Sequence, residues 1–322
     1  MNIRSLMFYG MLLFLLLAAV ACSSDGEDDT FGTPVSNQVE PHDDQDHGEG
    51  EHTHLDPDEV TGKMSVGLVP SEMVVGPNRF AVGLFDEQGN LITDAEVHFH
   101  YYDLRDPDKA VYESDADAQR IQSPDGQTTI YTHDREFESP GLWGVEVEAR
   151  LANGEAAKHR IGVEILEDST TLSPGDKAPY IHTPVLNDVG LDASQLTSAQ
   201  EPLPGLHETS LDAALDNDRP TLLLFATPAF CETRFCGPAY EMVGELHQEY
   251  ADEVNFVYVE VFAGLPDPAV TGWQATSGAQ AFGIQSEPWV YLLAEDGTIV
   301  YRLEGLFTAA EIEQQLQRRL GL

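Results

Sequence analysis

Cys231 and Cys236 are the side chains of this sequence best suited to reactive chemistry, with four residues between them. They follow a short apolar run at residues 221–225, which is typical of a strand buried on both faces. Apolar positions at helical spacing over residues 242–250 predict a helix that begins in or just after the cysteine pair. A thiol near a helix N-terminus is favoured as the thiolate, and a second thiol close by can form a disulfide and release whatever the first has attacked. The spacing leaves a structural disulfide, or two small buried side chains, open as the alternative.

The N-terminal residues predict export. Arg4 precedes an almost wholly apolar run at residues 6–20, which is too short for a comfortable membrane span and ends in small residues. The small residues directly before Cys22 resemble a bacterial lipoprotein signal, which implies that residues 1–21 are removed and that the Cys22 thiol is lipidated. Ordinary signal cleavage near Ala21, or an uncleaved anchor, is the alternative. We therefore expect a chain that is lipid-anchored to a bacterial membrane in the cell envelope, where disulfides persist.

Residues 22–59 contain very few apolar side chains and are predicted to form a disordered acidic tether. The tether holds His42, His47, His52 and His54 among carboxylates. Such a segment could bind copper, zinc or nickel weakly, but a solvated linker is the simpler interpretation because no fixed geometry is implied. No metal site and no cofactor is predicted.

The chain is strongly acidic. Its 56 acidic and 16 basic residues give a formal net charge of -40. This charge argues against nucleic acid as a partner, because a phosphate backbone would be repelled. The length that remains after the tether predicts two domains.

The first domain is predicted at residues 60–167. Val97, Phe99 and Tyr101 alternate with His98 and His100, as in a strand with one buried face, and similar short strands are separated by turn signals. This pattern predicts an all-β antiparallel sandwich. It resembles the immunoglobulin-like modules of bacterial periplasmic proteins, some of which are linked to copper handling. The two histidines share a face of their strand, and we interpret them as solvent-facing side chains rather than metal ligands.

A polar linker at residues 168–175 leads into a second domain at residues 176–322. Its pattern is strand, helix, strand, then a short helix, a hairpin and an amphipathic closing helix at residues 308–320. This order predicts an α/β fold with a mixed central sheet.

This second domain resembles the thioredoxin superfamily. The resemblance rests on the apolar strand that leads into Cys231, on Glu287-Pro288-Trp289 before a strand, and on Gly305 with the closing helix. Residues 175–179, with the sequence Gly-Asp-Lys-Ala-Pro, resemble the entry to the redoxin branch, which includes membrane-tethered thiol-disulfide proteins and peroxiredoxins. In this superfamily a cis-proline faces the reactive cysteine and helps to hold an extended substrate, and Pro288 stands at that position.

The chain also departs from the superfamily. Thioredoxin-type enzymes usually separate the two cysteines by two residues, whereas the four-residue separation here resembles the peroxiredoxin Q branch. Thr227 lies one residue out of register with the peroxide-binding threonine of that branch, and Pro288 takes the place of its arginine. The central strand also lacks the buried acid of thioredoxin, so Glu232 and Glu287 are the nearest candidates for proton transfer.

The predicted function is thiol-disulfide exchange with protein or small-molecule partners. Cys231 would attack as the thiolate, Cys236 would resolve the mixed disulfide, and Pro288 would orient the partner. One alternative is a thiol peroxidase of the peroxiredoxin Q kind. A second is a non-catalytic thioredoxin-fold binding protein with a structural disulfide. A metallochaperone is disfavoured, because no histidine follows His247 to complete a copper site with the two thiols.

Overall fold

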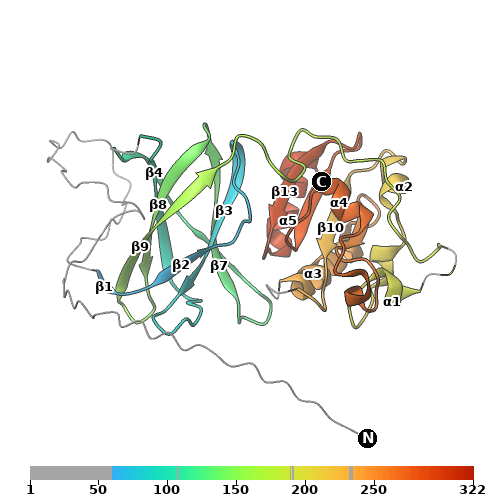
Figure 1. The fold of residues 1–322 in the computed structure, drawn as a ribbon, viewed down its shortest axis with the longest axis horizontal. Helices are drawn as coiled ribbons and strands as arrows, with labels where there is room; N and C mark the ends of the chain where they lie inside the picture. The colour runs from blue at the N-terminus through green and yellow to red at the C-terminus, as the bar shows by residue number, and fades with distance from the viewer. Residues whose placement is uncertain (1–59, 107–108, 189, 191, 232–234) are drawn as a thin grey trace, which may run out of the picture.

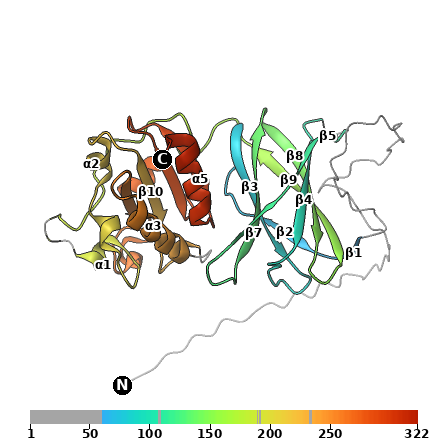
Figure 2. The same ribbon diagram turned by 180° about the vertical axis from the view of Figure 1, so that it is seen from behind.

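The computed structural model describes residues 60–106, 109–188, 190, 192–231 and 235–322. The predicted signal peptide, Cys22 and the tether lie outside these residues. Within the described residues, none of the helices combines the length and the apolar character that crossing a bilayer requires. Figures 1 and 2 show an N-terminal part made of strands beside a C-terminal part in which helices cover a sheet.

The N-terminal part consists of two sheets. One has the strand order β1-β9-β8-β4-β5 and the other β2-β3-β7-β6. The strands are β1 (Val60–Gly62), β2 (Ser65–Leu68), β3 (Gly76–Phe85), β4 (Glu96–Asp103), β5 (Val111–Asp117), β6 (Gln119–Gln122), β7 (Thr129–Phe137), β8 (Gly141–Arg150) and β9 (Ala156–Ile165).

One buried cluster lies between these two sheets. It includes Phe80 from one sheet and Phe99 from the other, whose rings meet edge to face with centroids 5.1 Å apart. The predicted alternation places Phe99 and Tyr101 in this core. One feature of the predicted sandwich is wrong, since β1 pairs with β9 in parallel while the other ladders of this part are antiparallel.

The C-terminal part is built on a four-stranded sheet with the order β11-β10-β12-β13. Strand β10 pairs with β11 in parallel and with β12 antiparallel, so the sheet is mixed, as predicted. The elements are α1 (Ala193–Leu196), α2 (Leu211–Leu215), β10 (Thr221–Ala226), α3 (Cys236–Tyr250), β11 (Asn255–Glu260), α4 (Ser277–Phe282), β12 (Trp289–Leu293), β13 (Ile299–Glu304) and α5 (Ala309–Leu320), with two short 3-10 helices at Pro204–His207 and Pro268–Thr271.

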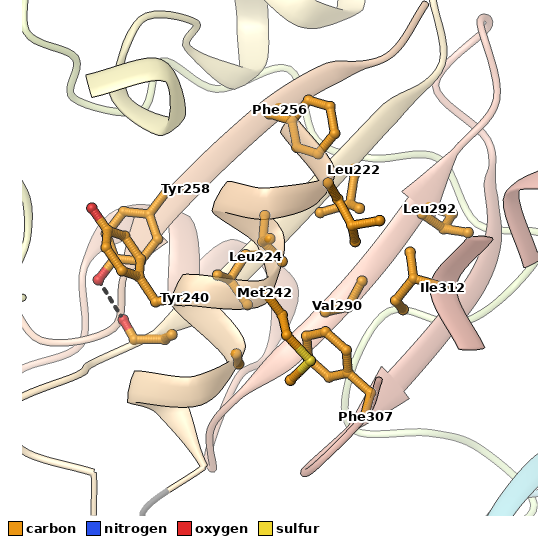
Figure 3. Packing of buried hydrophobic residues seen from close by; sticks show 14 of the residues in the cluster. Leu222, Leu224, Tyr240, Met242, Phe256, Tyr258, Val290, Leu292, Phe307 and Ile312 are labelled. Atoms are coloured by element: carbon orange, nitrogen blue, oxygen red, sulfur yellow. Dashed lines mark hydrogen bonds between the residues drawn. The ribbon is translucent and has the colours of Figure 1, made fainter. Parts of the chain in front are cut away.

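Every residue of β10 is buried, because helices cover both faces of the sheet. On one face, Leu222 and Leu224 pack against α3 and α5. Figure 3 shows Met242 of α3 in the same packed cluster as Val290 and Phe307. On the other face, the alternate side chains of β10 pack against α2 and α4. The apolar run that the sequence showed at 221–225 is therefore the centre of a three-layer arrangement.

Buried charges join the two parts. Arg79 of β3 lies against Glu311 of α5, with Nε 2.5 Å from Oε1 and Nη2 2.9 Å from Oε2. Glu72, which precedes β3, accepts a hydrogen bond from Arg302 of β13 at 3.0 Å. The side chains of these four residues are at most 10% exposed. Strand β13 and helix α5 accordingly lie on the side of the C-terminal part that faces β3 and β7 (Figures 1 and 2).

Candidate active site

The two cysteines lie where β10 leads into α3. Cys231 is half-buried and follows the end of β10 after a short turn, whereas Cys236 is fully buried and is the first residue of α3. The two cysteines are not joined by a disulfide. Their sulfur atoms and a carboxylate oxygen of Glu287 all lie within 4.8 Å of one another. To form a disulfide, whose S–S bond is about 2 Å long, the two sulfurs must approach each other from this separation.

Helix α3 begins at Cys236, within the cysteine pair, as the sequence predicted. Cys236, rather than Cys231, therefore lies at the helix N-terminus. Pro238 lies in the first turn, where its missing N–H group costs no helical hydrogen bond.

The environment of Cys236 keeps its thiol protonated. Burial raises the pKa of Cys236 far above its ordinary value, and the neighbouring Cys231 and Glu287 add to the effect. A backbone contact from Thr227 works in the opposite direction but is the smaller influence. Cys236 must therefore lose its proton during any reaction in which it acts as a nucleophile.

Pro288 and Glu287 lie beside Cys231. The Glu287-Pro288 peptide bond is cis and directly precedes β12. The Cys231 thiol lies 3.9 Å from the backbone oxygen of Glu287, within hydrogen-bond range for sulfur. The structure thus brings together four of the predicted residues: both cysteines, Glu287 and Pro288. The fifth, Glu232, lies outside the described residues.

Glu260 is a buried acid near this site that the sequence reasoning missed. It ends β11, and in the parallel ladder it pairs with Ala226, the last residue of β10. Glu260 is 6% exposed, and burial raises the pKa of its carboxyl group despite hydrogen bonds from Ser198 N and the Tyr258 hydroxyl. An acid at the end of an otherwise apolar buried strand was the sequence signal that could have identified it.

Thr227 connects Glu260 with the cysteine pair. Its hydroxyl and the Oε1 atom of Glu260 are both buried without a hydrogen bond of ordinary geometry in the described part of the chain. The hydroxyl nevertheless lies close enough to lower the pKa of Glu260 relative to burial alone. The backbone of the same threonine contacts Cys236. Thr227 is therefore a neighbour of both the buried thiol and the buried carboxyl group.

The N-terminal part supports both sides of the site. Phe235, which directly precedes Cys236, packs with Leu306 against a small apolar cluster that includes Ala81 and Ile121 of the N-terminal part. Ser286, which precedes Glu287, donates a hydrogen bond to Glu304.

Glu304 also binds a residue of the N-terminal part. Its Oε2 atom accepts hydrogen bonds from the backbone and the hydroxyl of Ser71, at 2.7 and 2.9 Å. The segments on each side of the thiols are thus held from outside the C-terminal part.

An aromatic group includes Phe230, the residue directly before Cys231. The ring of Phe230 meets Trp273 edge to face at 5.5 Å, and Trp273 meets Phe262 at the same distance. Trp273 is 49% exposed, so the group offers apolar surface to solvent.

No protein-family model and no curated protein matches this chain. Among solved structures, a protein from Chlorobium tepidum described as a thiol:disulfide interchange protein, DsbE, is 18% identical, and the match covers 47% of this chain and 100% of that one with a TM-score of 0.33. A superoxide reductase (neelaredoxin) from Ignicoccus hospitalis is 10% identical over 32% of this chain and 80% of that one, with a TM-score of 0.21. CopC from Methylosinus trichosporium OB3b is 14% identical over 33% of this chain and 97% of that one, with a TM-score of 0.21. These scores are too low to assign a fold family or a function to this chain.

Proposed function

We propose that this chain is a thiol-disulfide oxidoreductase of the cell envelope, with a thioredoxin-like fold in residues 176–322 and an immunoglobulin-like sandwich in residues 60–167. One observation carries the proposal. The half-buried Cys231 and the fully buried Cys236 lie within bonding reach of each other, beside the peptide bond that precedes Pro288. An accessible thiol can attack a partner, and a buried one can be reserved for the second step.

The reaction proceeds through a mixed disulfide. The Cys231 thiolate attacks one sulfur of a partner disulfide, and the other partner sulfur leaves as a thiolate. Cys236 then gives up its proton and attacks the Cys231 sulfur. The bond between Cys231 and the partner breaks, the second partner thiolate is released, and the cysteine pair becomes a disulfide. Two electrons and two protons pass to the partner in this direction, and the reverse direction oxidises the partner.

Removal of the proton from Cys236 is the least favourable step of this reaction. Because burial raises the pKa of that thiol, its attack requires an acceptor nearby. Glu260 is the first candidate for this acceptor, because its own raised pKa brings it closer to that of a thiol. Glu287 lies nearer the sulfurs and is the second candidate for this role.

Trapping of the mixed disulfide tests the proposal. Cys236→Ser should accumulate a covalent adduct with a disulfide-containing peptide through Cys231, whereas Cys231→Ser should accumulate none. Equal trapping by both variants, or by neither, would contradict the assigned roles. Addition of hydrogen peroxide to the reduced protein tests the peroxidase alternative. Rapid oxidation of Cys231 to a sulfenic acid, with little exchange of disulfides, would favour that function instead.

Membrane attachment is part of the proposal and rests on the residues before Cys22. Mass spectrometry of protein extracted from membranes should find a diacylglyceryl group on an N-terminal Cys22. A soluble mature chain with an unmodified Cys22 thiol would refute the anchor but would leave the redox proposal intact.

A further inference from the structure

The outer face of the β1-β9-β8-β4-β5 sheet carries a cluster of imidazoles and carboxylates. Because Phe99 and Tyr101 of β4 point into the core, their neighbours His98 and His100 point to the opposite face. We expected these histidines to face solvent. Instead His100 is 2% exposed and the side chain of His98 is 13% exposed, so both are held among other side chains.

The donor atoms of this cluster have the spacing of metal ligands. His98, His100 and Asp115 each offer one donor atom, and these atoms all lie within 4.8 Å of one another. Nε2 of His98 lies 3.7 Å from Oδ1 of Asp115, and Nε2 of His100 lies 3.4 Å from Oε2 of Glu148. Two ligand atoms bound at about 2.1 Å to a tetrahedral ion lie roughly 3.4 Å apart.

Hydrogen bonds orient His98 and Asp115 toward each other. Nδ1 of His98 lies 2.7 Å from the carboxylate of Asp117, which fixes the proton on Nδ1 and leaves the Nε2 lone pair directed at Asp115. The Tyr112 hydroxyl donates to Oδ2 of Asp115 at 2.6 Å, while Oδ1 faces the imidazole. A carboxylate behind a metal-binding histidine is the usual arrangement in protein metal sites.

Glu148 is held in the same way. Its Oε1 atom lies 2.8 Å from the ammonium group of Lys158, and its Oε2 atom faces His100. The same ammonium group lies 3.0 Å from Glu146, which also contacts Arg160. Asp115 and Glu148 thus each have one oxygen anchored by a neighbour and the other facing a histidine of the cluster.

The charges of the cluster favour a divalent cation. Two cationic side chains, Lys158 and Arg160, face four carboxylates, which belong to Asp115, Asp117, Glu146 and Glu148. With neutral imidazoles, these described groups carry two excess negative charges, which one divalent ion would balance. A surface hollow lined in part by His98 and Glu148 gives such an ion a path from solvent.

We propose that His98, His100 and Asp115 bind a divalent first-row transition metal. The donors are nitrogen and oxygen without sulfur, a set that suits zinc or copper(II). The site lies on a different part of the fold from the cysteine pair, so it is independent of the proposed redox function.

Equilibrium dialysis with Zn²⁺ alone, followed by metal analysis, tests the site. The protein is the full untagged chain in which other candidate ligands are removed: the four tether histidines are replaced by alanine and both Cys231 and Cys236 by serine. This background should retain one tightly bound ion per chain. His98→Ala with His100→Ala should abolish that binding, and Asp117→Ala should weaken it by about 10- to 100-fold through the loss of the supporting carboxylate.

His182→Ala is the matched control, because His182 also contacts two carboxylates but is 52% exposed. It should leave zinc binding unchanged. A second measurement does not depend on whether the variants fold. The copper(II) form of the background protein, which keeps both histidines, should show electron paramagnetic resonance splitting from two imidazole nitrogens. The proposal is overturned if the background binds no ion, if binding survives removal of both histidines, or if His182→Ala weakens it as much.

Discussion

Glu72 joins the N-terminal and C-terminal parts, and its replacement by glutamine should destabilise the full chain in a pH-dependent way. The Glu72 side chain is 5% exposed. Burial alone would raise its pKa, but hydrogen bonds from Ser169, Thr170 and Thr171 outweigh burial and hold the pKa at about 2, against an ordinary value of 4.5. The Arg302 guanidinium, 3.0 Å away, is the charged partner of the carboxylate.

The magnitude follows from this pKa. Each pKa unit corresponds to about 1.4 kcal/mol, so a shift from 4.5 to about 2 corresponds to roughly 3 kcal/mol. We expect about 2 kcal/mol after a discount for residual solvent screening. Because the pKa is lower in the folded protein, this stabilisation is fully present above pH 4.5 and is lost as the pH falls toward 2.

Urea unfolding followed by tryptophan fluorescence measures the effect, because Trp289 lies under Arg302 with 5.3 Å between the guanidinium carbon and the ring centroid. Glu72→Gln should lower the free energy of unfolding by about 2 kcal/mol near neutral pH, and the difference from the parent should shrink as the pH falls below 4.5. The control is Glu87→Gln, because Glu87 forms an exposed ion pair with Lys63 at 3.9 Å. This substitution should change the free energy of unfolding by less than about 0.5 kcal/mol. A difference that does not vary with pH, or one no larger than in the control, would refute the reasoning.

Three further predictions concern the interior around the site. Glu260→Gln should slow resolution of the mixed disulfide by at least about tenfold in stopped-flow assays, and Glu260→Asp should restore part of the rate. Glu260→Gln should not lower the stability of the protein, because it removes a buried charge. Phe235→Ala should expose the adjacent Cys236, which a thiol reagent should then modify faster than in the parent; an unchanged rate would exclude a role for this packing. Burial lowers the pKa of His207 to about 4. As the pH falls, the imidazole is therefore protonated in the unfolded chain before it is protonated in the folded one, so stability should decrease between the ordinary pKa of 6.5 and pH 4. His207→Gln should flatten that part of the urea-derived stability profile, and a profile identical to the parent's would count against the assignment.

Much of the C-terminal part could be predicted from local pattern. Strand β12 coincides with an apolar run, and α5 lies within the amphipathic helix predicted at residues 308–320. Helix α3 ends at Tyr250, as its spacing indicated. These elements carry their own periodicity and caps, so their limits depend little on distant contacts.

Features that depend on contacts between distant segments could not be predicted. Glu260 is brought near the cysteine pair only by the parallel register of β10 and β11, which sequence spacing does not specify. The burial of His100 depends on side chains from neighbouring strands, not on the alternation of β4 itself. The contact of Phe235 with the N-terminal part likewise arises from the packing of two parts that fold from separate segments.

The reduction potential of the Cys231 and Cys236 pair tests the central claim most directly. Purified protein equilibrated with glutathione buffers of defined potential can be quenched with an alkylating reagent and its oxidised fraction read by mass. A functional exchange pair should change between dithiol and disulfide within the range that glutathione buffers cover, above roughly -300 mV. A bridge that remains fully oxidised below that potential would behave as a structural disulfide, and the proposed exchange function would be wrong.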